Sequence, residues 1–315
     1  MTNALNISVV ICTYNRAKIL ADTLVSFSKM SFSDLGAFEL VIVDNNSNDE
    51  TAEITKSFCL DQPYARYLYE EKPGLSHARN KGILESSGNV IVFIDDDVYL
   101  DQNWLHAVER VFANHPDAAA FGGKSIPQFE NGRPEWLKEW MAGMYGDTGF
   151  GDDPRWVEFP KIPFGLNMGF RRWVFDQIGL FNPKLGRVKG SLLSNEEVDI
   201  FWRIAQAGLK VYYAPEALLY HRIPASRSDP KWIIERYYWQ GISTVVFDQI
   251  IHPQSKLALL RGAMKCAWQA FQGFRGGHVS PRQAYWHYLG LSVEYKCLRW
   301  YDLGVARQKL REAIS

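Results

Sequence analysis

The sequence is poor in cysteine, in long apolar runs and in net charge, and each shortage excludes a class of protein. Its 315 residues include four cysteines, which lie far apart and show neither CxxC spacing nor a compact disulfide pattern. We therefore expect free thiols in a reducing compartment. No uncharged apolar run approaches the roughly 20 residues that a membrane-spanning helix needs. The 35 Lys and Arg are balanced by 35 Asp and Glu, which disfavours a nucleic-acid binder.

The N-terminal segment also lacks the features of a secretory signal. No basic region, apolar stretch of signal length or small-residue cleavage site precedes the strand-like residues 7–11. With the cysteine usage, this predicts a cytoplasmic protein whose membrane contact, if it has one, is peripheral. The remaining composition, with 47% apolar and 14% aromatic residues, is that of a globular protein with a large core.

The neutral total hides an asymmetry between two parts of the chain. Residues 222–315 hold 14 Lys and Arg against 6 Asp and Glu, and residues 1–221 are net acidic by the same amount. We expect two domains with this boundary. A net-acidic domain is a natural place for a divalent cation, whereas a basic, aromatic region suits an anionic surface or the acidic domain itself.

A strand, a polar turn and a helix recur three times in the first hundred residues. Strands are predicted at residues 7–11, 39–43 and 89–94, an extended segment at 66–70, and helices at 17–30, 50–58 and 76–86. This alternation predicts an α/β domain of parallel βαβ units with helices on both faces of the sheet. Ligands in such folds bind at the carboxyl ends of the strands. The polar turns at residues 13–16, 44–47 and 95–97 are therefore expected to converge.

The rest of the chain is less regular at first. Residues 122–166 are rich in Gly, Pro and Trp, which predicts long loops or an irregular sheet. A helix is predicted at 196–207, followed by strands at 210–213 and 217–221. Three amphipathic helices are predicted after them, at 230–251, 255–274 and 281–313. On the second of these, four apolar residues share one face: Leu260, Met264, Trp268 and Phe271.

Three adjacent carboxylates, Asp95, Asp96 and Asp97, follow an apolar strand. They repel one another unless a cation or a set of donors is present, and hard oxygen ligands select Mg²⁺ or Mn²⁺. The alternative interpretation is a solvated acidic turn. His221 ends the last predicted strand and is a candidate to complete a metal site, since imidazole is a frequent supplement. Taken alone, a single histidine at a strand end is more often structural or incidental.

Asp44, Arg79 and the Ser194–Glu197 segment each allow two interpretations. Asp44 either binds a nucleotide base or ribose, or forms an Asx-turn or helix cap. Arg79 either directs its guanidinium at a phosphate or the aspartates, or is solvated. Ser194 and Glu197 fit a capping box, while the alternative makes Glu196 or Glu197 the general base for a hydroxyl nucleophile.

Taken in order, these segments resemble the inverting, metal-dependent family 2 glycosyltransferases of the GT-A fold. The resemblance covers nearly all of residues 9–221, and seven stretches carry it: VVICTYNR (9–16), ELVIVDNNSNDET (39–51), GLSHARNKG (74–82), VIVFIDDD (90–97), GLNMGFRR (165–172), NEEVDIFWRIAQAG (195–208) and ALLYH (217–221). It implies a Rossmann-like, mostly parallel central sheet flanked by helices, with a C-terminal helical appendage.

The resemblance also implies roles for individual residues. It assigns nucleotide-sugar binding to Thr13, Tyr14, Asn15, Arg16, Asp44, Asn46, Arg79, Asp95, Asp96 and Asn167. Asp95 and Asp97 match the outer members of the family's Asp-x-Asp motif, and with His221 they would hold Mn²⁺ or Mg²⁺. The family's usual base position is taken by Glu197. Many members have Asp there, so Glu196 stays an alternative base.

The implied activity is transfer of a sugar from a nucleoside-diphosphate sugar, UDP-sugar by default, to a hydroxyl of a glycan or lipid-linked acceptor. The product would be a polysaccharide, a glycolipid or a glycoprotein glycan. Two alternatives remain, a metal-dependent nucleotidyltransferase and a non-catalytic sugar-nucleotide-binding module. Residues 222–315 are either a helical cap on the acidic domain, with a homodimer contact, or a peripheral contact with the inner face of a membrane.

Overall fold

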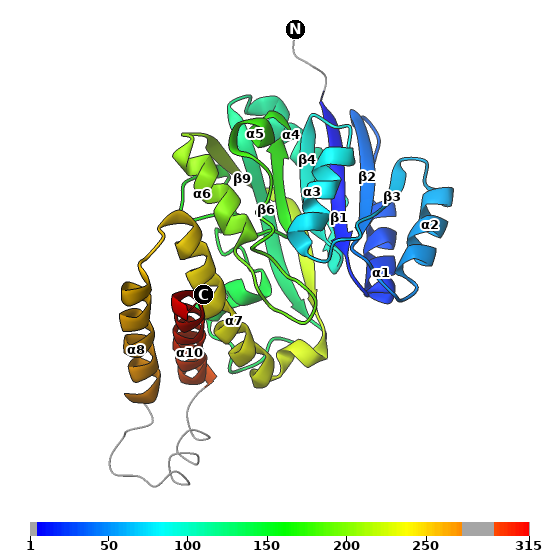
Figure 1. The fold of residues 1–315 in the computed structure, drawn as a ribbon. Helices are drawn as coiled ribbons and strands as arrows, with labels where there is room; N and C mark the ends of the chain where they lie inside the picture. The colour runs from blue at the N-terminus through cyan, green and yellow to red at the C-terminus, as the bar shows by residue number, and fades with distance from the viewer. Residues whose placement is uncertain (1–4, 273–292, 315) are drawn as a thin grey trace. The chain divides into compact units, whose positions relative to one another are not determined.

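The computed structural model describes residues 5–272 and 293–314. Its largest element is a mixed β-sheet with the strand order β3-β2-β1-β4-β8-β6-β9-β5. Four of these strands form a parallel half: β1 (Asn6–Thr13), β2 (Ala37–Asp44), β3 (Ala65–Tyr69) and β4 (Val90–Asp95). They lie next to one another in Figure 1, coloured blue to cyan. The predicted parallel βαβ arrangement is confirmed for this half.

The other half of the sheet is built from antiparallel pairs. Its strands are β5 (Val98–Leu100), β6 (Ala118–Phe129), β7 (Arg155–Val157), β8 (Asn167–Arg171) and β9 (Lys210–Ile223). The strand β9 is continuous over 14 residues, so the prediction of two separate strands at 210–213 and 217–221 is wrong. Its burial alternates along much of its length, which is the pattern of a strand with two unlike faces.

The glycines of the middle region serve close packing. Gly122 and Gly123 lie within β6, and a Cβ atom on either would collide with Pro163 or with the Asn167 side chain and the Ala217 carbonyl. Glycine in a strand often marks such an approach of neighbouring chain. The composition that predicted loops or an irregular sheet over 122–166 therefore belongs partly to a regular strand.

Helices cover both faces of the parallel strands, as their nearly continuous burial requires. On one face, Val9 and Ile11 pack with α1 (Ala17–Ser28) and α4 (Trp104–Asn114). On the other face, Val10 and Val41 pack with α3 (Leu75–Glu85), α5 (Trp173–Ile178) and α6 (Glu196–Gln206). The helix α2 (Thr51–Asp61) follows β2. The sheet is thus held rigidly from both sides, which fixes the positions of its strand ends.

The chain divides into two compact units. The first comprises residues 1–128, 145–183 and 196–223, and the second comprises residues 129–144, 184–195 and 224–315. The second unit contains α7 (Pro230–Ile251), α8 (Lys256–Gln272) and α10 (Val293–Ile314). Gly241 of α7 and Gly304 of α10 allow these two helices to touch, since a Cβ on either would meet the backbone of the other helix.

The three predicted C-terminal helices are present, and the third is described from residue 293 onward, so its predicted first part lies outside the described residues. The described part of the chain also contains two short 3₁₀ helices, η1 (Glu139–Tyr145) and η2 (Ala225–Ser228). Within the described ranges, Cys12, Cys59 and Cys266 carry free thiols, and the side chain of Cys297 is outside them. No helix in residues 5–272 and 293–314 is long and apolar enough to cross a bilayer.

Candidate active site

The polar turns at the carboxyl ends of β1, β2 and β4 converge. The strand register places Thr13 beside Asp44 and Cys12 beside Asp95. The first two turns are tied together by Asn15, whose N–H donates to Ser47 Oγ at 2.9 Å and whose Oδ1 accepts from the N–H of Asn48 at 2.8 Å. The first and third turns are tied by Thr13 Oγ1, which donates to Asp96 Oδ2 at 2.7 Å. The predicted convergence is therefore present in the structure.

The β2 turn holds a buried carboxylate. Asp44 Oδ1 accepts from the N–H of Ser47 at 2.9 Å, which is the Asx-turn that the sequence allows, and Oδ2 accepts from the Tyr67 hydroxyl at 2.9 Å. Burial and the Asp44 carboxylate raise the pKa of Tyr67, so this hydroxyl stays protonated. Asn46 lies beside it in the left-handed region (φ 63°) and accepts from the Tyr69 hydroxyl at 3.0 Å.

Arg16 joins two of the three aspartates. Its guanidinium lies 2.5 Å from Asp96 Oδ1 and 2.7 Å from Asp97 Oδ2. Burial raises the pKa of Asp96 to about 6, against the attraction of Arg16, which lowers it. Asp96 and Asp97 are both buried, so the alternative of a fully solvated acidic turn is wrong for these two residues. Only Asp95 is partly exposed, with 39% of its side chain accessible.

His221 faces Asp97 in a defined tautomer. Its Nδ1 lies 2.6 Å from the backbone carbonyl oxygen of Tyr145, which can only accept, so Nδ1 carries hydrogen. Its Nε2 lies 3.3 Å from Asp97 Oδ1. In the neutral ring this nitrogen would present a lone pair to a carboxylate oxygen. Burial alone would lower the pKa of His221, but Asp97 and the Tyr145 carbonyl raise it, so a positive charge is favoured at this contact.

The same contact fits a divalent cation. A ligating histidine generally donates its other ring N–H to a carbonyl or carboxylate, and Tyr145 supplies that carbonyl. A nitrogen and a carboxylate oxygen at this separation can both reach one ion at ligand distances of about 2.0–2.2 Å. Asp95, the third predicted ligand, is not part of this pair, and no group of three His, Cys, Asp or Glu in metal-binding geometry occurs among the described residues.

Arg79 is buried, with 3% of its side chain accessible, so the solvated alternative for this residue is wrong. One amino group lies 2.7 Å from Glu196 Oε1, and the other donates to the Gly165 carbonyl at 3.3 Å. Its guanidinium carbon lies 5.8 Å from the ring centroid of Phe93 and 5.4 Å from that of Phe181. The Arg79 guanidinium comes within 3.9 Å of Asp95, so it joins the β4 turn to the start of α6.

Glu196 and Glu197 begin α6 but lie in different surroundings. Glu196 Oε1 is held by Arg79, whereas Glu196 Oε2 is buried without a hydrogen-bond partner among the described residues. Glu197 Oε2 is buried and has no hydrogen-bond partner among the described residues, although the residue as a whole is partly accessible. Burial, together with the neighbouring Glu196 carboxylate, raises the pKa of Glu197 to about 8, against the attraction of Arg79. A carboxyl group with such a pKa takes up and releases a proton near neutral pH.

The capping box predicted for α6 is not formed. The Ser194 hydroxyl donates to Gln240 Oε1 at 3.2 Å and also contacts Asn195 and Ser243, while Asn195 takes a left-handed conformation (φ 74°). Glu197 is therefore not explained as the partner of a helix cap. The predicted helix pair of Asp199 with Arg203 is present, with a nitrogen to oxygen distance of 2.7 Å.

Asn167 is placed near this region but has its polar atoms engaged. Its amide nitrogen donates to the carbonyls of Lys124 and Ala217, at 3.0 and 2.8 Å, and its Oδ1 accepts from Trp104 Nε1 at 3.1 Å. It thereby ties β8 to β6, β9 and α4. Tyr14, the remaining predicted residue, is half buried. Trp104 and the Tyr145 carbonyl could not be predicted as parts of this region, because neither has a sequence motif of its own.

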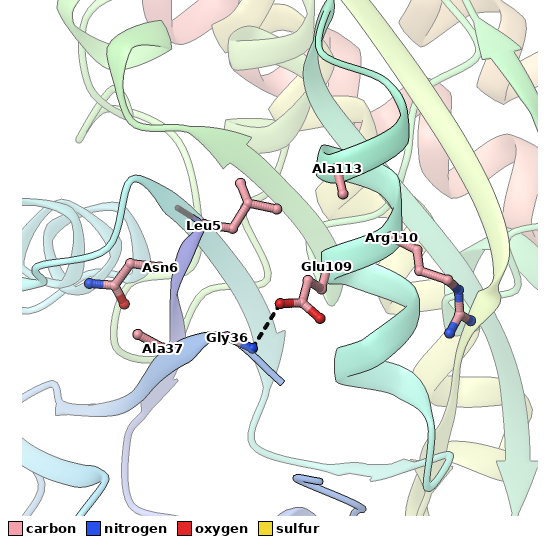
Figure 2. A pocket seen from close by; sticks show the side chains of 7 residues that line it. All are labelled: Leu5, Asn6, Gly36, Ala37, Glu109, Arg110 and Ala113. Atoms are coloured by element: carbon pink, nitrogen blue, oxygen red, sulfur yellow. Dashed lines mark hydrogen bonds between the residues drawn. The ribbon is translucent and has the colours of Figure 1, made fainter. Parts of the chain in front are cut away.

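A pocket of 440 Å³ lies at the amino ends of β1 and β2 and contains none of the predicted site residues. It is drawn in Figure 2, with its seven lining residues: Leu5, Asn6, Gly36, Ala37, Glu109, Arg110 and Ala113. Glu109 of α4 accepts a hydrogen bond there from the N–H of Gly36 at 2.8 Å. Because ligands of open α/β sheets bind at the carboxyl ends, this pocket is separate from the candidate site.

Comparison with known proteins gives a consistent result. The family model described as Glycosyl transferase family 2 matches residues 8–179. A glucosyl-dolichyl phosphate glucuronosyltransferase of Haloferax volcanii is 30% identical over 257 residues, which are 80% of each chain. The succinoglycan biosynthesis protein ExoM of Rhizobium meliloti is 25% identical over 240 residues, covering 75% of this chain and 73% of its own.

Among solved structures, a mannosyltransferase of Pyrobaculum calidifontis in complex with GDP-Man and Mn²⁺ has a similar fold. It superposes with a TM-score of 0.63 at 18% identity, covering 98% of this chain and 88% of its own. At this identity the likeness concerns the fold.

Proposed function

The chain belongs to glycosyl transferase family 2 and is a glycosyltransferase with a GT-A fold; from this premise we propose that it transfers a sugar from a nucleoside-diphosphate sugar to an acceptor hydroxyl with inversion at the anomeric carbon. The family excludes the nucleotidyltransferase alternative. The single observation that carries the proposed mechanism is the pair of adjacent carboxyl groups at the start of α6: Arg79 holds Oε1 of Glu196, while no residue in the described part of the chain makes a hydrogen bond to the buried Oε2 of Glu197.

Glu197 is proposed as the general base. The acceptor hydroxyl attacks the anomeric carbon from the side opposite the departing diphosphate, and its proton passes to the Glu197 carboxylate as the new bond forms. Such a direct displacement inverts the centre. Glu196 is less suited to this task, because its Oε1 is already paired with the Arg79 guanidinium at 2.7 Å.

Asp97 and His221 are proposed to hold a Mn²⁺ or Mg²⁺ ion, with Asp95 at the exposed edge as third ligand. When bound, such an ion supplies positive charge to the leaving diphosphate. Arg16 forms an ion pair with Asp97 Oδ2, and the other carboxylate oxygen, Oδ1, is directed toward His221. The Mn²⁺ in the Pyrobaculum mannosyltransferase supports this assignment.

The donor nucleotide is proposed to bind along the three converging turns. Thr13, Tyr14, Asn15 and Arg16 line the first turn, Asp44 and Asn46 the second, and Asp95 and Asp96 the third, while Arg79 and Asn167 lie behind them. Arg16 and Arg79 act here mainly by holding carboxylates in place, since both guanidinium groups are already paired. UDP-sugar is the default donor, and the solved mannosyltransferase carries GDP-Man, so both nucleotides belong in the test.

The acceptor is proposed to be a glycan or a lipid-linked sugar, in synthesis of a polysaccharide, glycolipid or glycoprotein glycan. The name of the Haloferax relative, a glucosyl-dolichyl phosphate glucuronosyltransferase, supports a lipid-linked acceptor. Residues 1–221 would bind the donor and perform the transfer, and residues 222–315 would contact the acceptor or its surroundings.

A thermal-shift panel of UDP- and GDP-sugars, with and without Mn²⁺, tests this proposal. A ligand that binds only the folded state at 100 times its Kd stabilises it by about 2.7 kcal/mol. We expect a metal-dependent rise in Tm for one donor, lost in Asp97→Asn and retained in the control Asp153→Asn, whose side chain is exposed. No rise with any nucleotide or nucleotide-sugar would favour a protein that no longer binds donors and would refute the proposal.

A further inference from the structure

The helix α8 carries an apolar stripe on its exposed side. Leu257, Met264 and Trp268 have exposed fractions of 57%, 65% and 52%. At about 100° per residue these three positions fall within about 40° of one another around the helix axis. We call these three residues the outer stripe. Two of them, Met264 and Trp268, belong to the apolar face that the sequence predicts, and both are exposed.

The opposite side of α8 packs against α10. Leu259 and Ala263 are 2% and 6% exposed, and a Cβ atom on Gly262 would lie 2.8 Å from the Nζ of Lys309 on α10. Residues of small or moderate size thus make the contact within the unit, while Met264 and Trp268 face away from it. Large apolar side chains on the outside of a helix mark an interaction surface when they are contiguous.

The charged side chains of α8 all have the same sign. The helix α8 contains Lys256, Arg261 and Lys265 and no acidic residue. Measured around the helix axis from the middle of the stripe, Arg261 and Lys265 lie at about 40° and about 80° on one side, and Lys256 lies at about 100° on the other. The same distribution, with cations beside an apolar face that includes Trp, is found in helices that lie in the interface of a bilayer.

We propose that the outer stripe of α8 and its three cations bind the surface of an anionic lipid bilayer. The apolar side chains enter the boundary between headgroups and acyl chains, and the cations contact anionic headgroups. A second copy of the chain fits less well, because a twofold contact would bring the cations of one α8 close to those of the other. This inference goes beyond the transferase activity and does not depend on the identity of donor or acceptor.

Co-flotation of the full chain with vesicles tests the proposal without any nucleotide-sugar or metal present. The probes are vesicles of pure phosphatidylcholine and vesicles of phosphatidylcholine mixed with the anionic lipid phosphatidylglycerol. We expect partition onto the anionic vesicles and little onto the neutral ones. Each cation near a charged surface changes the partition about fivefold, so Arg261→Gln with Lys265→Gln should lower it about 25-fold.

Matched variants show whether vesicle binding depends on the outer stripe or on exposed apolar and basic residues in general. Met264→Ser with Trp268→Ser should also release the protein from anionic vesicles. The controls Leu60→Ser, at an 88% exposed leucine of α2, and Lys29→Gln with Arg110→Gln should bind as the parent protein does. An unchanged circular dichroism spectrum and Tm show that each variant is folded.

Two results would overturn the proposal. The first is absence of binding to anionic vesicles, or equal binding by the parent and both α8 variants. The second is a concentration-dependent dimer in sedimentation velocity that the Met264→Ser/Trp268→Ser variant loses, since the stripe would then be a contact between copies. The flotation experiment does not measure sugar transfer. A negative result would therefore reject the membrane proposal without affecting the proposed transferase activity.

Discussion

Two arginines organise the carboxylates of the candidate site, and they do so differently. Arg16 holds both Asp96 and Asp97, and Asp97 also faces His221 at 3.3 Å. Arg79 holds one oxygen of Glu196, while the other oxygen of Glu196 and Oε2 of Glu197 are buried without a hydrogen-bond partner among the described residues. We call these sets the Arg16 cluster and the Arg79 cluster.

The difference indicates a division of tasks. In the Arg16 cluster, one guanidinium fixes the carboxylates of Asp96 and Asp97 and directs one oxygen at an imidazole whose tautomer is set by Tyr145. That arrangement holds a cation at a fixed point. In the Arg79 cluster, Arg79 neutralises one glutamate, and burial leaves the other with a pKa of about 8. That arrangement exchanges a proton.

The largest effect is expected from Glu197→Gln. Loss of a general base typically lowers the rate 10²–10⁴-fold. We expect kcat to fall by about that factor while donor binding stays within about twofold, because the amide keeps the shape of the side chain but cannot accept the proton. Steady-state transfer assays measure kcat, and Glu216→Gln, at an exposed position of β9, is the control. Transfer within a few-fold of the parent rate would remove Glu197 as the base.

Arg79→Met is expected to have the next largest effect, on stability. It leaves Glu196 buried without its counter-charge, and breaking a buried pair in this way costs roughly 3–5 kcal/mol. Denaturant unfolding gives the change in the free energy of unfolding. Adding Glu196→Gln to Arg79→Met should recover a large part of the loss, because the unpaired charge is then gone. If the double variant is as unstable as the single one, Arg79 does not stabilise the fold through its ion pair with Glu196.

The pH dependence of transfer follows from the raised pKa of Glu197. A base acts in its ionised form, so the active fraction grows as the pH rises through the folded-state pKa of about 8. We expect kcat/KM to increase about tenfold per pH unit below that value and to level off above it. A profile that is flat between pH 6 and pH 9 would show that no group of this kind limits the reaction.

The smallest effect is expected from an exposed pair on the same helix as Arg79. Lys81 and Glu85 lie 3.6 Å apart on α3, with side chains 32% and 51% accessible. Exposed pairs at this spacing contribute about 0.3–0.5 kcal/mol. Glu85→Gln should therefore leave the denaturation midpoint almost unchanged. If Glu85→Gln lowers the free energy of unfolding as much as Arg79→Met does, burial does not explain the difference expected between the two ion pairs.

The sequence was sufficient for the parallel half of the fold. Continuous apolar runs predicted β1, β2 and β4, and the polar turns after them predicted where Thr13, Asp44 and Asp95 would meet, because parallel strands share one carboxyl edge. The antiparallel half was harder to predict. The continuity of β9 and the packing of Gly122 against Pro163 depend on segments that are distant in the chain.

The site shows the same limit. Residue types left alternatives for Asp97, His221 and Glu197, and the resemblance to family 2 selected these three; what distinguishes Glu197 from Glu196 is Arg79, 117 positions away from Glu196. The tautomer of His221 is set by a backbone carbonyl, which leaves no trace in a side-chain pattern. The capping box could not be excluded from the sequence for a similar reason. The Ser194 hydroxyl makes its hydrogen bonds with Gln240 and Ser243, which are distant in the chain.

The most direct test of the division of tasks measures donor affinity and transfer rate together in Asp97→Asn and Glu197→Gln. Isothermal titration with the donor found in the thermal-shift panel, in the presence of Mn²⁺, gives the affinity, and single-turnover kinetics gives the rate of transfer. The account predicts that Asp97→Asn loses metal-dependent affinity, whereas Glu197→Gln binds the donor normally and transfers at least about 100-fold more slowly. Equal losses of affinity in both variants, or normal transfer by Glu197→Gln, would contradict it.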